Sequence, residues 1–136
     1  MARYDTLFTT DRFNVSEVGK HFINDCCFGE GLAEWLRQEL IKKGMTTGTP
    51  GQEDWGWYLF VEQGSERYFV GVTGFHKEGA LNANEGEWRI MVERRRTFWA
   101  TLRGTHKITD ADPILFLIER LLREQSDVRN VTRESP

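Results

Sequence analysis

Apolar residues recur at helical spacing between residues 29 and 43. The first is Leu32, and Trp35, Leu36 and Leu40 follow it by three, four and eight positions. This periodicity predicts an amphipathic helix that packs on a sheet. Gly44 follows directly and suits the left-handed residue that ends many helices, so we expect the helix to stop there.

A second segment, near the C-terminus, repeats this spacing. Its apolar residues are Ile114, Leu117, Ile118, Leu121 and Leu122. Asp112 precedes them as a good N-cap residue, and Pro113 suits the first helical position. The pattern therefore predicts a helix that begins at Pro113.

Three segments between these helices alternate in polarity with a period of two, as β-strands do. The first, residues 55–61, carries Tyr58 and Phe60 on one face, and because its other face is also apolar we expect a central strand. That other face holds Trp55, Trp57, Leu59 and Val61. The second runs over residues 67–73 after a Gln-Gly-Ser hairpin turn, and the third runs over residues 87–94 with one polar face.

The remaining segments give weaker signals. Residues 1–24 predict one or two short strands, residues 46–53 a turn-rich connection, and residues 74–86 a long loop rich in Gly and Asn. Residues 95–107 favour a helical turn over a strand, and residues 127–132 predict a short edge strand.

These elements predict the fold class α+β, in a single domain over residues 1–136. We expect an antiparallel sheet of about four to five strands, with two main helices packed on one or both of its faces. A chain of 136 residues suits one hydrophobic core. Five Trp and nine Phe exclude the class of intrinsically disordered chains, which contain few aromatic residues.

Charge and hydropathy restrict the partners. A net charge of −3 argues against nucleic-acid binding over the whole surface. The sequence shows neither a secretory signal pattern nor an apolar run long enough for a membrane helix, so we expect a cytoplasmic protein. The only cysteines, Cys26 and Cys27, are adjacent, and because a disulfide between neighbours is strained they favour a reducing compartment. We expect no cofactor and no metal.

Two stretches together resemble a set of small bacterial proteins of unknown function. They are residues 24–36, Asn-Asp-Cys-Cys-Phe-Gly-Glu-Gly-Leu-Ala-Glu-Trp-Leu, and residues 50–57, Pro-Gly-Gln-Glu-Asp-Trp-Gly-Trp. In that set a Cys-aromatic-Gly-acid helix start precedes a Glu-Asp-aromatic-Gly-Trp strand, an antiparallel sheet and a C-terminal helix. The similarity in element order covers most of residues 20–125. The resemblance implies a bacterial cytosolic domain and carries over no catalytic residue. This chain differs from the set at Gly31, where the set has an acid.

Cys27 is the best candidate nucleophile. It stands just before the first predicted helix, a position at which the helix dipole favours a thiolate. A catalytic thiol also needs a base, and His21, His76 and His106 could each serve only in an assumed fold. A buried, inert cysteine is the more common case. A zinc site through His21, Cys26 and Cys27 is disfavoured, because adjacent cysteines do not readily take two tetrahedral positions.

Glu53 and Asp54 are the candidate carboxylates. As neighbours on an extended chain they point to opposite faces, so they do not converge on one bond as paired catalytic carboxylates do. A structural role, such as ending the strand or pairing with an arginine, is the favoured interpretation.

Two further sets are candidate binding residues. Trp55 and Trp57 could form a stacking platform for a ligand, although aromatic residues on strands usually lie in the core. Residues 89–107 contain six basic side chains against one acid, Glu93. A solvated basic face is the favoured interpretation of this stretch, and binding to RNA or to an acidic protein is the alternative. The residues proposed to carry such binding are Arg94, Arg95, Arg96 and Trp99.

The aromatic strands and the absence of a convergent catalytic set favour a non-enzymatic binding or protein-interaction domain. An inhibitor of a partner protein, such as an immunity protein, or another regulatory protein would fit. A small enzyme that uses Cys27 or a carboxylate near Asp54 is the alternative. Weak RNA binding through residues 89–107 is a second alternative, and the fold by itself does not choose between them.

Overall fold

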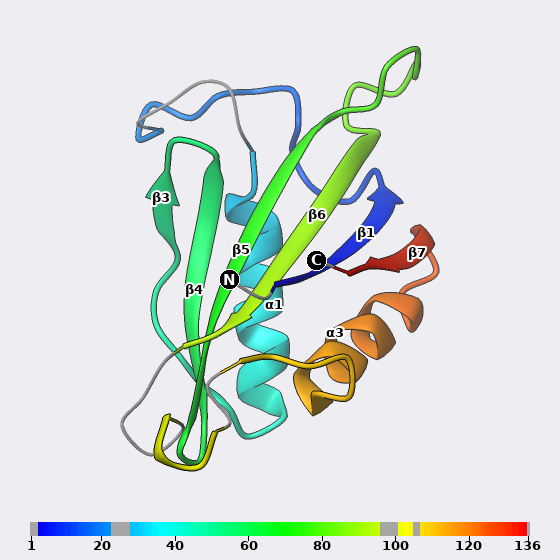
Figure 1. Ribbon diagram of the computed structural model, residues 1–136. Coiled ribbons are helices and arrows are strands. Elements are labelled where there is room, and N and C mark those ends of the chain that lie inside the picture. Colours follow the sequence, from blue (N-terminus) through cyan, green and yellow to red (C-terminus); the bar gives the residue numbers. More distant parts are fainter. Residues whose placement is uncertain (1–2, 23–27, 96–100, 105–106, 136) are drawn as a thin grey trace.

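A twisted antiparallel sheet forms the frame of the molecule, and its two long helices pack on the same face (Figure 1). The computed structural model describes residues 3–22, 28–95, 101–104 and 107–135, and the structural statements below concern these residues. The sheet has seven strands in the order β2-β4-β5-β6-β1-β7, and β3 pairs with β4. The elements are β1 (Tyr4–Thr10), α1 (Glu30–Lys42), β2 (Thr46–Thr47), β3 (Gly51–Glu53), β4 (Gly56–Gln63), β5 (Glu66–His76), β6 (Gly86–Arg94), α3 (Pro113–Arg123) and β7 (Val128–Glu134).

The α+β class and the antiparallel sheet are confirmed, but seven strands replace the expected four to five. The segment predicted as a turn-rich connection contains both β2 and β3. Each pairs with β4, so together they form one edge strand that is interrupted at residues 48–50. They are two and three residues long, which is too short to show an alternating pattern, and Pro50 between them lacks a backbone N–H.

The other strands lie close to their predicted positions. The first 22 residues hold one strand, β1, and the predicted edge strand near the C-terminus is β7, which pairs with β1. The predicted loop is shorter than expected, because β5 continues to His76 and β6 starts at Gly86. A hydrogen bond from the Lys77 N–H to the Glu85 carbonyl (2.7 Å) closes the connection between them.

One hydrophobic core lies between the sheet and the two helices. The strands contribute alternate residues to it, such as Leu59 of β4, Val70 of β5 and Ile90 of β6, all fully buried. The helices contribute their predicted apolar stripes, which include Leu32, Leu36, Leu40, Ile114, Ile118 and Leu122. Because both stripes pack on the same face, neither helix covers the opposite face of β4, β5 and β6.

The first helix ends at the predicted glycine. Gly44 has a left-handed backbone (φ 87°), and its N–H donates to the carbonyl of Ile41 at 3.0 Å. The N–H of Met45 donates to the carbonyl of Leu40 at 3.1 Å. These two bonds form a Schellman motif, which satisfies carbonyl groups that a helix end otherwise leaves unpaired.

The second helix begins at the predicted N-cap, which also joins it to the sheet. The Asp112 carboxylate accepts a hydrogen bond from the N–H of Ile114 at 3.4 Å. It accepts two more from the sheet, from the Tyr68 hydroxyl at 2.9 Å and from the Arg94 guanidinium at 2.7 Å. Arg94 also pairs with Glu66. This Asp112 cluster (Glu66, Tyr68, Arg94 and Asp112) fixes the start of α3 on β5 and β6.

We expect Tyr68 to make the fold lose stability at alkaline pH. Burial, and then the charge and hydrogen bond of Asp112, raise the pKa of Tyr68 well above its ordinary value of 10.0. Below pH 10 the hydroxyl is protonated in both states and this stabilisation is fully present. Above pH 10 the unfolded chain loses the proton first, so stability declines by up to about 1.4 kcal/mol per pH unit as the pH approaches the folded pKa.

Urea unfolding at pH values between about 9 and 11.5 measures this decline. Tyr68→Phe should flatten it, because the variant has no hydroxyl to ionise at this position. Tyr58→Phe, which removes a hydroxyl from the other face of the sheet, should leave it unchanged. The same decline in wild type and in Tyr68→Phe would show that another group is responsible.

Candidate functional site

The face of β4, β5 and β6 that carries no helix gathers large apolar side chains, and we call it the open face. Phe60 is 42% exposed, Phe75 55% and Trp55 36%. The apolar residues of this face are Trp55, Tyr58, Phe60, Phe69, Phe75 and Met91. Large apolar side chains that gather on a surface are typical of binding sites, whereas single exposed ones are common everywhere.

The rings at the centre of the open face touch one another. Tyr58 and Phe69 stack with their centroids 5.6 Å apart, and Phe60 lies 5.4 Å from Tyr58 and 5.8 Å from Phe69. The guanidinium of Arg95 lies 4.4 Å from the centroid of the Phe60 ring, which is a cation–π contact. The result is a continuous aromatic surface with a cation at one edge.

Trp55 and Trp57, which the alternation places on one face, lie on opposite faces. Trp57 is buried in the core at 4% exposure, so it offers no surface to a ligand. Trp55 belongs to the turn before β4, because the strand begins at Gly56 and the alternation does not extend to residue 55. The indole of Trp55 lies over Gly71 of β5, where a Cβ atom would come within 2.7 Å of the ring. Of the two tryptophans, only Trp55 fits the predicted platform.

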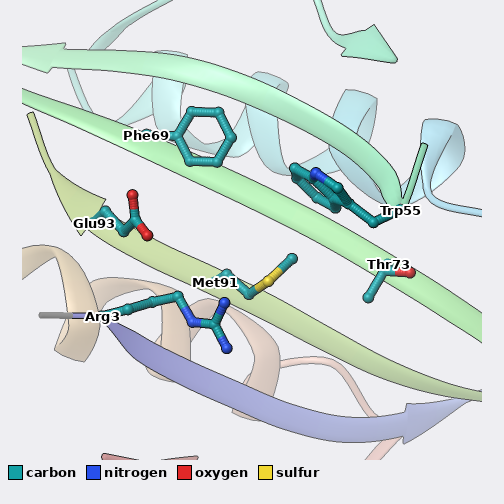
Figure 2. Close-up of a pocket in the computed structure, with 6 residues that line it drawn as sticks. All are labelled: Arg3, Trp55, Phe69, Thr73, Met91 and Glu93. Carbon is teal, nitrogen blue, oxygen red and sulfur yellow. The ribbon is translucent and has the colours of Figure 1, made fainter. Parts of the chain in front are cut away.

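A groove of about 420 Å³ crosses the open face beside Trp55 (Figure 2). Phe69 and Thr73 line it from β5, and Met91 and Glu93 line it from β6. Trp55 completes it on one side and Arg3, just before β1, on the other. The volume lies in the range of known small-ligand sites, and the walls combine aromatic rings with charged groups.

The basic stretch of residues 89–107 forms ion pairs with acids far away in the sequence. Arg89 pairs with Asp5 and Glu134, and Arg94 pairs with Glu66 and Asp112, with only 12% of its side chain exposed. Arg103 also pairs with Glu66, at 3.2 Å. Arg95 lies over Phe60 on the open face, whereas Arg96 and Trp99 lie outside the described residues. Three of the six basic residues, Arg89, Arg94 and Arg103, are therefore paired with carboxylates that local charge counting could not detect.

The candidate nucleophile, Cys27, lies outside the described residues, as do Cys26 and His106, so its reactivity stays a prediction. Glu53 ends β3 and Asp54 lies in the following turn; both are exposed, and neither lines the groove.

The two described histidines contact separate partners. The His21 imidazole lies 2.8 Å from the Glu30 carboxylate, and His76 lies 3.0 Å from the carbonyl of Asn82. Among the described residues, no group of three or more His, Cys, Asp or Glu is placed to hold a metal ion.

Comparison with protein-family models, with curated proteins and with solved structures finds no match to this chain. The resemblance to small bacterial proteins therefore stays a prediction. In the part of the chain that the structure describes, no helix is long and apolar enough to cross a membrane. The open face and its groove are thus the main basis for a functional proposal.

Proposed function

We propose that this protein is a non-enzymatic interaction domain whose open face binds a partner protein. One observation carries the proposal: aromatic residues, Met91 and Arg95 gather on the sheet face that neither helix covers. Trp, Tyr, Phe, Met and Arg are the residues that the centres of protein interfaces favour. A role as an inhibitor, immunity protein or other regulator would need such a face and no catalytic group.

The energetics of the face agree with this role. Complete burial of an exposed Phe side chain contributes roughly 1.5–3 kcal/mol, and Phe60 and Phe75 are both about half exposed. The ring contacts of Phe60 with Tyr58 and Phe69 hold its side chain in place before a partner arrives. A partner that covers this face therefore gains apolar burial while ordering few side chains.

Photo-crosslinking from the open face tests the proposal. We would place a benzophenone amino acid at Phe60 or Phe75 of the full chain in the cell of origin. The expected result is the same crosslinked protein from both positions, followed by direct binding of that purified protein. Phe60→Ala should then weaken binding about tenfold or more in calorimetric titration, because interface aromatic anchors contribute more than about 1.4 kcal/mol.

Phe116 of α3 provides a matched control. It is 56% exposed, and the Arg133 guanidinium lies 4.7 Å from its ring centroid, much as Arg95 lies over Phe60. A benzophenone at Phe116 should not capture the same protein, and Phe116→Ala should not change the affinity. Equal losses in Phe60→Ala and Phe116→Ala would contradict the proposal. Crosslinks only to a second copy of this chain would reassign the face to self-association.

A further inference from the structure

The groove on the open face contains a carboxylate that no side chain in the described part of the chain neutralises. Glu93 lies on β6, half-buried, on the groove wall. Among the described residues its side chain has no hydrogen-bond or ion-pair partner. A half-buried carboxylate without a partner favours a cation that comes from outside the chain.

The other charges beside the groove cancel one another. Arg3 donates to the Asp5 carboxylate at 3.1 Å, and Arg89 pairs with both Asp5 and Glu134. Asp5 is only 3% exposed and pairs with both arginines, so it keeps their guanidinium groups close to the sheet. Two arginines and two carboxylates carry no net charge. Arg95, another cation of the open face, lies over Phe60 and does not line the groove, so Glu93 is the charge of the groove lining that has no counterion among the described residues.

Phe69 lies opposite this carboxylate on the neighbouring strand, and the Trp55 ring lies next to Phe69 in the same groove. The centroids of Trp55 and Phe69 are 6.1 Å apart and their planes are inclined by 65°. The face of an indole or phenyl ring attracts an organic cation, most strongly when the site is partly shielded from water. Figure 2 shows Trp55, Phe69 and Glu93 on the same side of the sheet, around one hollow.

We propose that this groove binds a cationic side chain of the partner protein, arginine in preference to lysine. The inference rests on the proposed function, since it names the group by which the partner is recognised. A guanidinium is planar, so it can stack on an aromatic face while it donates two hydrogen bonds to a carboxylate. A lysine ammonium is a more strongly hydrated point charge and gains less from a ring.

A small probe tests the groove without any partner. The full ¹⁵N-labelled chain would be titrated with N-acetyl-arginine amide, and the indole N–H signal of Trp55, assigned through Trp55→Phe, would be followed by NMR. We expect a saturable shift with a dissociation constant in the range of about 1–50 mM, as suits one isolated contact. N-acetyl-citrulline amide has the same shape without the charge and should bind at least about fivefold more weakly, as should N-acetyl-lysine amide.

Glu93→Gln should weaken binding of the arginine probe about fivefold or more, because it removes the unpaired charge. Glu87→Gln is the matched control: Glu87 is an exposed acid on the same strand and the same face, and it does not line the groove. The control should bind the probe as wild type does. Thermal unfolding should be the same for both variants, which verifies that the fold is intact.

Three results would overturn the inference: no saturable shift of the Trp55 signal, equal binding of the citrulline and arginine probes, or unchanged binding in Glu93→Gln. Lysine probe binding as tight as arginine binding would overturn the preference for arginine. Probe binding without any crosslinked protein would contradict the interaction role and keep the cation site. Crosslinking without probe binding would contradict only the cation site.

Discussion

Asp112→Ala is expected to lower the free energy of unfolding by about 3–5 kcal/mol, as measured by urea denaturation. The variant leaves the largely buried guanidinium of Arg94 with Glu66 as its one remaining carboxylate partner, and the Tyr68 hydroxyl without its acceptor. It also removes the N-cap of α3, a loss of about 1 kcal/mol that lies within this range. Because whole domains are stable by only about 5–15 kcal/mol, this variant should be close to unfolding.

Two comparisons separate the buried ion pair from a general effect of removing an acid. Asp110→Ala changes an exposed acid two residues earlier and should cost less than about 0.5 kcal/mol. Adding Arg94→Met to Asp112→Ala should recover part of the loss, since it removes a largely buried charge that has lost one of its two carboxylate partners, while Glu66 keeps Arg103 as a partner. A cost below about 1 kcal/mol for Asp112→Ala would show that the cluster does not stabilise the fold.

Local patterns in the sequence predict most of the framework. A helix is specified by residues within a few positions of one another, so the spacing before Gly44 and the pair Asp112 and Pro113 set both helices correctly. Alternation similarly identifies β4, β5 and β6, whose inward residues are the buried ones. The short strands β2 and β3 are not visible in this way, because their pairing with β4 and not their own composition makes them strands.

Contacts between distant residues limited the prediction of the site. The basic stretch contains one acid, yet Arg89 and Arg94 meet carboxylates from β1, β5, β7 and the start of α3. Asp112 is recognisable as an N-cap from its neighbours, but its ion pair with Arg94 depends on how α3 meets the sheet. A charge count along the sequence therefore misses the carboxylates that neutralise Arg89, Arg94 and Arg103.

The sequence pattern of β4 fits an exposed apolar face as well as a strand that is buried on both sides. Tyr58 and Phe60 make the second face of β4 apolar, which indicates a strand buried on both sides. The two long helices both pack on the other face, so in the structure these aromatic residues reach the surface. When the strands have more apolar faces than the predicted helices can cover, the sequence pattern itself indicates an exposed apolar face.

Gly56→Ala is the second change expected to have a large effect, with a loss of about 3 kcal/mol in the free energy of unfolding. A Cβ atom at this position would lie 2.3 Å from the carbonyl oxygen of Val72 and 3.1 Å from the Cβ of Thr73. Backbone cannot rotate away as a side chain can, so β4 and β5 would have to separate at this end. The glycine therefore makes room for the neighbouring strand.

Substitutions at two other glycines separate the effect of this backbone contact on stability from an effect on the groove. Gly48→Ala has no atom within 4 Å of the added Cβ and should change stability by less than about 1 kcal/mol. Gly71→Ala would meet the outer edge of the Trp55 ring at 2.7 Å, and because that side chain can turn away, the stability cost should be smaller than for Gly56→Ala. It should nevertheless displace Trp55 and weaken binding of the arginine probe. If Gly56→Ala were as mild as Gly48→Ala, the close packing of β4 on β5 at this position would not be required for the fold.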